Sequence, residues 1–132
     1  MILVDTSVLI DFLKDIKNSD TKKMNEIMEL EIPFGITSHI YQEVLQGASN
    51  IRHFELLKSY FNTFNFYLPK DIKASYEEAA KIYFQCRKKG ITIRSTIDCL
   101  IVQICVENEL KLLHKDKDFE KISKVVKKLK FY

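Results

Sequence analysis

Four acidic residues stand at positions where a carboxylate contributes little to folding and could bind a metal ion. They are Asp5, Glu43, Asp98 and Asp116. The first follows the apolar residues 2–4 and the last follows the largely apolar residues 112–114, and both runs are typical of short buried parallel strands. In open α/β sheets, binding sites lie beyond the carboxyl ends of such strands. We therefore expect the four carboxylates to meet in one acidic, metal-binding cluster.

Two of these residues could instead act as helix caps. Asp5 lies between a predicted strand and a predicted helix, and aspartate is among the most favourable N-cap residues. Ser7 could cap the same helix, which would leave the Asp5 carboxylate free. Asp98 stands three residues after Ser95, the Ser-x-x-Asp spacing of a capping box, and the helix dipole favours a carboxylate in a first turn. Taken alone, Asp98 is best explained as a cap.

The other two residues also have explanations that involve no ligand. Glu43 lies on the flank of an apolar helix face and, taken alone, would face solvent. Asp116 and the nearby Asp118 could be turn residues after a strand. Their spacing also matches the start of a calcium-binding loop, but Lys121 stands where that loop needs glycine and Lys127 where it needs glutamate. We therefore reject the calcium loop and keep the turn and metal interpretations open.

The elements that would position these side chains follow from hydrophobic periodicity and from the placement of glycine, proline and capping residues. Strands are predicted at 2–4, 34–37, 65–67, 112–114 and around 131. Helices are predicted at 7–13, 21–30, 38–47, 50–61, 71–89, 95–109 and 119–126. Such alternation of short strands and helices predicts an α/β fold, in which a parallel sheet lies between layers of helices.

Length and composition are those of a small globular protein. The 132 residues suffice for one domain, which we expect to span 1–132. Hydrophobic residues make up 46% and charged residues 30% of the chain, and no apolar stretch is long enough to span a membrane. The residues before Asp5 include no basic region of the kind that starts a signal peptide. We therefore expect a cytoplasmic protein.

Charge is more informative in its distribution than in its sum. The net charge of +3, from 21 basic and 18 acidic residues, does not by itself indicate nucleic-acid binding. However, eight lysines lie between 111 and 130, and a basic triplet at 87–89 precedes a further arginine. Most such residues belong to solvated helix faces, but next to an acidic metal site some could hold a polyanion by its phosphates. The candidates for this role are Arg94, Lys115 and Lys117.

Four sequence blocks, taken together, resemble a known family. Residues 2–13 read Ile-Leu-Val-Asp-Thr-Ser-Val-Leu-Ile-Asp-Phe-Leu, and residues 37–47 read Thr-Ser-His-Ile-Tyr-Gln-Glu-Val-Leu-Gln-Gly. Residues 93–101 read Ile-Arg-Ser-Thr-Ile-Asp-Cys-Leu-Ile, and residues 112–119 read Leu-Leu-His-Lys-Asp-Lys-Asp-Phe. Each block alone is a weak pattern. In this order, over essentially the whole chain, the four resemble a PIN domain of the VapC-type toxins found in bacterial and archaeal toxin–antitoxin pairs.

The resemblance implies a PIN-like fold, with a small central parallel β-sheet flanked by helices on both faces, and the activity of a metal-dependent endoribonuclease. The residues that match the acidic quartet of the family are Asp5, Glu43, Asp98 and Asp116. Three further residues are expected to support this quartet without binding the metal: Ser7, Thr96 and Asp118. His114 departs from the family, in which threonine or serine is common at this position. The resemblance also implies an RNA substrate such as tRNA or another structured RNA, an antitoxin partner and a homodimer.

Charge repulsion explains why a metal ion belongs in such a cluster. Four carboxylates within a few ångströms would raise one another's pKa unless a cation neutralised them. Hard oxygen ligands favour Mg²⁺ or Mn²⁺ over zinc. One ion, or two about 3.5–4 Å apart, would activate water and stabilise the leaving oxygen of an in-line displacement. We expect Asp5 and Asp98 to be the central ligands, with Glu43 and Asp116 completing the site or orienting water.

Two other classes of function remain open. The first is a catalytically silent PIN-like module that acts by binding protein, in which case metal would leave the melting temperature unchanged. The second is a nuclease of RNA processing or of DNA repair, such as a flap enzyme on a related fold. We rank DNA repair last, because a chain of this length lacks the helical arches and clamps of those larger enzymes.

Overall fold

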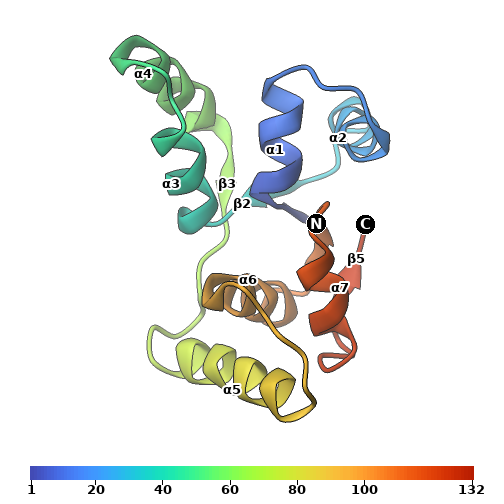
Figure 1. Cartoon of the computed structure of the whole chain (residues 1–132). Coiled ribbons are helices and arrows are strands. Elements are labelled where there is room, and N and C mark those ends of the chain that lie inside the picture. Colours follow the sequence, from blue (N-terminus) through green and yellow to red (C-terminus); the bar gives the residue numbers. More distant parts are fainter.

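A five-stranded parallel sheet forms the centre of the protein, which is described over residues 1–132 by a computed structural model (Figure 1). The strands are β1 (Ile2–Val4), β2 (Phe34–Ile36), β3 (Asn65–Phe66), β4 (Lys111–Leu113) and β5 (Lys130–Phe131). Their order across the sheet is β3-β2-β1-β4-β5, and every neighbouring pair is parallel. The predicted α/β fold with a parallel sheet is therefore confirmed.

Seven α-helices and one short 3-10 helix connect and cover the strands. They are α1 (Thr6–Leu13), α2 (Ser19–Glu29), α3 (Ser38–Gln46), α4 (Ile51–Tyr60), the 3-10 helix η1 (Phe61–Thr63), α5 (Ala74–Lys88), α6 (Thr96–Glu107) and α7 (Lys117–Ser123). Figure 1 shows α1 and α2 on one side of the sheet and α5 and α6 on the other. Between these layers, 28 buried apolar residues form one continuous core.

The central position of β1 determines which chain segments meet. Strand β1 pairs with β2 on one side and with β4 on the other, so that Val4 lies opposite Leu113. The backbone N–H of Asp5 donates to the Leu113 carbonyl at 2.9 Å, which continues this pairing to the end of the strand. Because parallel strands share one carboxyl edge, the residues after β1 and β4 emerge side by side.

All of the predicted strands and helices are present, and the differences lie at their ends. The helix predicted from residue 50 is α4, which Asn50 caps by accepting from the His53 N–H at 2.9 Å. The helix predicted from residue 38 is α3, and its N-cap is Thr37, which accepts from the Ile40 N–H, rather than Ser38. Either hydroxyl satisfies the capping preference, so the sequence alone does not distinguish two adjacent candidates.

Two helices show how a single aspartate side chain determines where a helix begins. The fifth helix begins at Ala74 rather than at residue 71, because the Asp71 carboxylate turns back to accept from the N–H groups of Lys73 and Ala74. The last helix runs from Lys117 to Ser123 rather than from 119 to 126. It begins earlier because the Asp116 side chain caps it by accepting from the Asp118 N–H.

Candidate metal centre

One cavity of about 320 Å³ lies at the carboxyl edge of β1 and β4 and is lined by five carboxylates. They belong to Asp5, Glu43, Asp98, Asp116 and Asp118. The structure thus brings together all four residues of the expected cluster and adds the fifth, Asp118. Ile101 is the one hydrophobic residue in the lining, and the others are polar or charged.

Asp5 is held at the end of β1 by the first turn of α1. It is the N-cap of this helix, and its Oδ2 accepts from the backbone N–H of Ser7 at 3.2 Å and from the Ser7 hydroxyl at 2.7 Å. Asp5, and not Ser7, therefore caps the helix, yet its carboxylate still lines the cavity. The side chain is buried, and this burial raises the pKa of Asp5 above its usual value despite the two hydrogen bonds.

Glu43 reaches the cavity from α3 and is held by a residue that the sequence analysis missed. The Thr6 hydroxyl donates to Glu43 Oε2 at 2.6 Å. Thr6 is buried, whereas the Glu43 residue as a whole is exposed, so this bond holds an otherwise mobile side chain against the site. The signal in the sequence was a hydroxyl residue directly after the first aspartate of the cluster.

Asp98 differs from the other carboxylates because no protein group donates a hydrogen bond to it. Ser95 caps α6 through the Ile97 N–H, and the reciprocal bond that would complete a capping box is not formed. The pKa of Asp98 is raised to about 7, mainly by burial and next by the negative charges of Asp5 and Asp116. This carboxyl group therefore holds a proton near neutral pH, because it is shielded from water and surrounded by negative charges.

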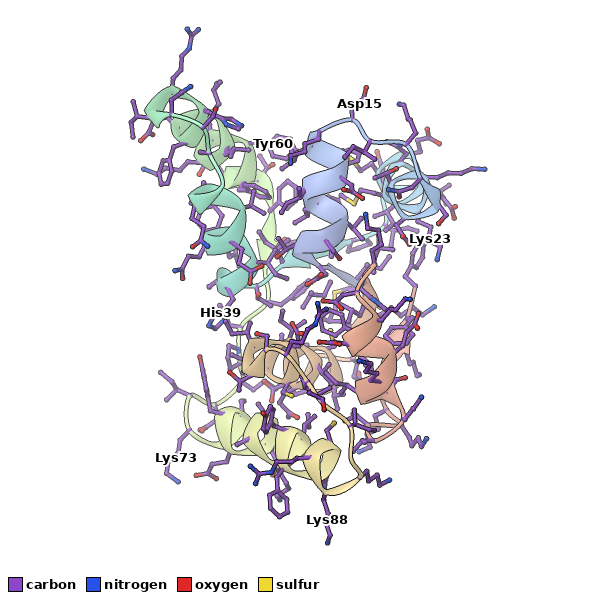
Figure 2. All side chains as sticks on the ribbon, in the orientation of Figure 1. Asp15, Lys23, His39, Tyr60, Lys73 and Lys88 are labelled. Carbon is purple, nitrogen blue, oxygen red and sulfur yellow. The ribbon has the colours of Figure 1, made fainter.

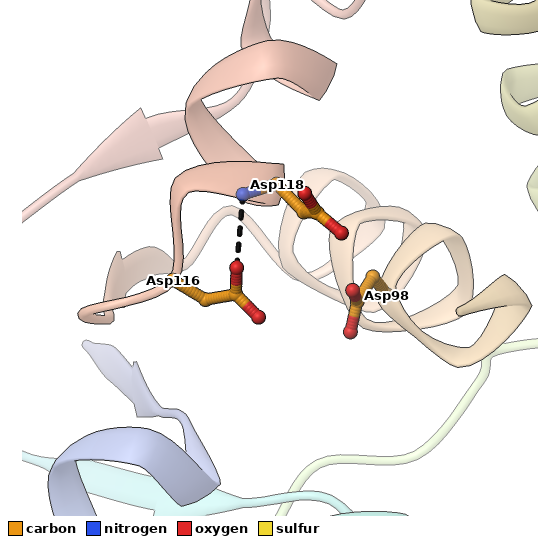
Figure 3. A group of neighbouring side chains, drawn as sticks. All are labelled: Asp98, Asp116 and Asp118. Atoms are coloured by element: carbon orange, nitrogen blue, oxygen red, sulfur yellow. Dashed lines mark hydrogen bonds between the residues drawn. The ribbon is translucent and has the colours of Figure 1, made fainter. Parts of the chain in front are cut away.

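Three carboxylates form the tightest part of the cluster (Figure 3). Oxygen atoms of Asp98, Asp116 and Asp118 lie within 4.8 Å of one another, a spacing that could hold a cation. Figure 3 shows Asp98 on α6 facing the other two from across the start of α7, where Asp116 Oδ1 accepts from the Asp118 N–H at 3.0 Å. Asp118, which was expected only to support the site, is therefore close enough to take part in it.

Arg94 neutralises part of this negative charge. Its Nε lies 3.0 Å from Asp118 Oδ2, and its Nη2 lies 3.0 Å from Asp116 Oδ1. Lys121 adds a third contact, at 3.5 Å from Asp118 Oδ1. Burial alone would raise the pKa of Asp118, but the hydrogen bonds and charge of Arg94 outweigh it, and the net shift is downward. Asp118 is thus a fixed anion beside Asp98, whose pKa is shifted the opposite way.

A basic pocket adjoins the acidic cavity. It shares Ser7, Arg94, Asp116 and Asp118 with that cavity and adds three lysines, which are Lys115, Lys117 and Lys121. None of its lining residues is hydrophobic. Lys117 forms no ion pair, whereas the Lys115 ammonium is paired with the Asp11 carboxylate. Of the three expected phosphate contacts, Lys117 alone therefore has a side chain free of an acidic partner.

Thr96 lies outside the acidic cavity. It is the first residue of α6 and lines a separate, mostly apolar cavity with His39, Tyr76 and Leu100, and Figure 2 shows His39 at the start of α3 facing this region. Ser95, one residue earlier, lines the acidic cavity instead. Consecutive residues at a helix start point in different directions, so a neighbouring position in the sequence did not imply a neighbouring position in the site.

His114, the residue that departs from the family pattern, packs against aromatic side chains and does not line the acidic cavity. Its ring is half-buried, with its centroid 4.5 Å from that of Phe131 and 5.2 Å from that of Phe119. Burial lowers the pKa of His114. The residue therefore fills space beneath the β4–α7 connection as a neutral aromatic ring.

The comparison with known families agrees with this architecture. A family model described as the PIN domain matches residues 2–125. The chain therefore belongs to the PIN-domain family.

The chain resembles curated proteins named VapC ribonucleases and solved structures of VapBC proteins. "VapC ribonuclease Mb1587" of Mycobacterium bovis and "Ribonuclease VapC11" of Mycobacterium tuberculosis are each 27% identical over 129 residues, which is 95% of this chain and 93% of theirs. The structure of VapBC-1 from nontypeable Haemophilus influenzae matches 100% of this chain and 97% of the other, with a TM-score of 0.74 and 18% identity. VapBC2 from Rickettsia felis, bound to a promoter DNA fragment, gives a TM-score of 0.73 at 16% identity and matches 100% of this chain and 98% of its own. These two structures show that the fold is shared.

None of the helices is both long enough and apolar enough to cross a membrane.

Proposed function

We propose that this protein is a metal-dependent endoribonuclease and the toxin of a toxin–antitoxin pair. The observation that carries this proposal is the convergence of five carboxylates on one cavity, with the pKa of Asp98 raised to about 7. A buried group of carboxylates in which one retains a proton near neutral pH would be stabilised by a bound cation. Membership of the PIN family and the ribonuclease names of the mycobacterial relatives support the assignment to RNA hydrolysis.

The ion that fits these residues is Mg²⁺ or Mn²⁺. The cavity presents carboxylate oxygens and neither histidine nor cysteine, which is the donor set that such hard cations prefer. When bound, the ion would polarise the phosphodiester, activate the attacking water and stabilise the leaving oxygen. We assign Asp5 and Asp98 as the central ligands, with Glu43 and Asp116 completing the site.

The protein groups around the ligands have complementary roles in this proposal. Ser7 holds Asp5 through its hydroxyl, and Thr6 holds Glu43 in the same way. Asp118 supports the site as a fixed anion, because Arg94 and Lys121 already occupy its oxygens. Proton release from Asp98 would accompany metal binding, since its carboxylate can bind the ion only after losing the proton.

The basic pocket beside the cavity supports RNA, such as tRNA or another structured RNA, as the substrate. A scissile phosphate at the acidic cavity would place a neighbouring phosphate close to Lys117, Lys121 and the exposed end of Arg94. Ammonium and guanidinium groups bind phosphates in this way without reading sequence. We assign Arg94 and Lys117 to phosphate contacts.

Protein partners are also part of the proposal. Large apolar side chains are exposed on α4 and in and just before α5, and the most exposed are Ile51 at 74%, Leu56 at 63%, Ile72 at 86% and Phe84 at 54%. In Figure 1 α4 and α5 lie at opposite ends of the molecule, so these side chains offer two separate apolar surfaces for protein contacts. Together with the similarity to VapBC complexes, they support an antitoxin partner and a homodimer. We further propose that residues 1–132 form a single PIN domain that acts on RNA in the cytoplasm.

Replacement of Asp5 by asparagine tests the enzymatic assignment. Asp5→Asn removes the charge of a central ligand but keeps its shape, so we expect cleavage of RNA to be lost while the protein stays folded. The matched control is Asp15→Asn, because Asp15 is exposed and lies at the far end of α1 (Figure 2). Full activity in Asp5→Asn would refute the assignment. An inactive wild type whose melting temperature does not respond to metal would indicate a silent binding module.

A further inference from the structure

Lys115 is attached to α1 at two points. Its backbone N–H donates to the Ser7 hydroxyl oxygen at 3.1 Å, and its ammonium group pairs with the Asp11 carboxylate. Ser7 and Asp11 are four residues apart in α1 and therefore lie on one face of the helix. A single face of α1 thus holds both the backbone and the side chain of this one residue, 104 positions away from Asp11.

Both attachments lie next to proposed metal ligands. The Ser7 hydroxyl that accepts from Lys115 donates in turn to Asp5 Oδ2 at 2.7 Å. Asp116 is the residue directly after Lys115, and its carboxylate lines the acidic cavity. The position of Asp116 relative to Asp5 is therefore determined where the turn after β4 meets α1.

A second side chain also holds the Asp11 carboxylate. Its residue is 9% exposed, and its Oδ2 also accepts from Asn18 Nδ2 at 2.9 Å, at the N-cap of α2. The side chain of Lys115 is 46% exposed, so the partner that extends toward solvent is the lysine and the anchored partner is the aspartate. A carboxylate held by both helices is a rigid support for the turn.

We propose that Asp11 is a positioning residue of the metal site, and that Lys115 holds Asp116 in place through Asp11 rather than binding RNA phosphate. This inference rests on the proposed function. In this inference, the Asp11–Lys115 pair sets the distance between the proposed metal ligands Asp5 and Asp116, which come from opposite ends of the chain. Neighbours that orient metal ligands commonly change metal affinity or activity by about 10- to 100-fold when they are replaced.

The test compares Asp11→Asn, Lys115→Met and the double variant with two further proteins. Lys115→Arg retains the ion pair, and Lys117→Met removes the other lysine at the same turn, which has no acidic partner. The dissociation constant for Mn²⁺ is measured by calorimetric titration of each metal-free protein. The kcat and KM for RNA are then measured at saturating Mn²⁺, and thermal unfolding verifies that each variant is folded.

We expect Asp11→Asn and Lys115→Met each to weaken Mn²⁺ binding about 10-fold and to lower kcat without changing KM. The double variant should bind Mn²⁺ no more weakly than the worse single variant, because both replacements break the same pair. Lys115→Arg should behave as the wild type. Lys117→Met should raise KM and leave Mn²⁺ affinity unchanged.

Two results would overturn the inference while the proposed function stands. The first is wild-type Mn²⁺ affinity in Asp11→Asn. The second is a Lys115→Met variant that, like Lys117→Met, raises KM alone, which would make Lys115 a phosphate contact. A wild-type protein that neither binds Mn²⁺ nor cleaves RNA would instead refute the proposed function, and this inference with it.

Discussion

At the scale of the residue, the site is defined by how differently its carboxylates are surrounded. Asp118 is buried between Arg94 and Lys121, and its pKa is lowered. Asp98 faces the same group of charges without a single hydrogen-bond donor, and its pKa rises to about 7. The carboxyl group of Asp118 is thus a fixed anion, whereas that of Asp98 retains a proton near neutral pH. Of the two, only Asp98 would be strongly stabilised in its charged form by a bound cation.

The raised pKa of Asp98 predicts a specific dependence of stability on pH in the metal-free protein. Between 3.8, its ordinary pKa, and about 7, the folded state binds a proton at Asp98 that the unfolded state does not bind. The free energy of unfolding contributed by this group therefore falls as pH rises through that window. We expect Asp98→Asn to become increasingly more stable than the wild type between pH 5 and pH 8, as measured by denaturant unfolding with a chelator present.

The comparison with Asp98→Asn isolates the effect of this one group. The lowered pKa of His114 acts in the opposite direction over part of the same pH range, but His114 is present in both proteins. A difference in stability between the two proteins that does not change with pH would contradict the raised pKa.

Arg94 is predicted to contribute to stability as well as to RNA binding. Arg94→Gln removes the main counter-charge of the buried Asp118 and leaves Lys121 as its remaining cationic contact. We expect the midpoint of denaturant unfolding at pH 7 to fall, since the pKa of Asp118 would rise and the stability that its lowered pKa contributes would be lost. The control is Arg52→Gln, at an exposed arginine of α4 that forms no ion pair. Equal midpoints for the two variants would show that Asp118 does not depend on Arg94.

Three residues of the carboxylate cluster could be predicted from the sequence, because Asp5 and Asp116 follow apolar strands and Asp98 stands in the first turn of a helix. Glu43 lies in the middle of α3 and was indicated by the resemblance to the PIN family. Two of the supporting residues could not be predicted. Thr6 bonds a residue 37 positions away and Asp11 one that is 104 positions away. Neither partner is indicated by local spacing, because only the packing of α1 against α3 and the β4–α7 turn brings them together.

At the scale of the element, the parallel sheet explains why residues from both ends of the chain form one site. Strand positions were predictable from short apolar runs, and the parallel arrangement followed from their alternation with helices. The strand order was not predictable, since β1 pairs with β2 and β4 but β3 lies at an edge. Pairing of β1 with β4 is the step that brings Asp116 to Asp5, and it depends on contacts between segments more than 100 residues apart.

The pairing of β2 with β3 requires a glycine. A Cβ atom at Gly35 would lie 2.3 Å from the Asn65 carbonyl oxygen, which is backbone and cannot move aside without displacing β3. We expect Gly35→Ala to lower the free energy of unfolding by roughly 1–3 kcal/mol, the usual effect of overpacking. Chemical denaturation of the metal-free protein measures this change.

Gly47→Ala is the matched control for this substitution. A Cβ at Gly47 would come no closer than 3.4 Å to its nearest neighbour, the Val44 carbonyl oxygen, which is ordinary contact. Gly47 also has a φ of −82°, which any residue can adopt. We expect a change within about 0.5 kcal/mol, as for most surface substitutions. A cost for Gly35→Ala no larger than this would mean that the two strands are not so closely packed.

At the scale of the whole molecule, a net charge of +3 hides an acidic region that adjoins a more basic one. Five carboxylates and Arg94 line the first cavity, and the second shares Arg94 and two of these carboxylates and adds three lysines. A polyanion would fit both regions at once, with one phosphate at a metal ion in the acidic cavity and the next phosphate at the lysines. The arrangement therefore favours a nucleic-acid chain over a small metabolite as the substrate.

The most direct test of the central claim is cleavage of a mixed pool of structured RNAs, including total tRNA, by the purified protein. The pool is incubated with Mg²⁺ or Mn²⁺, with a chelator, and with Asp98→Asn in place of the wild type. We predict discrete RNA fragments with either metal, and none with the chelator or with Asp98→Asn. Fragments that persist in the presence of chelator, or that Asp98→Asn produces equally well, would contradict a metal-dependent ribonuclease at this site.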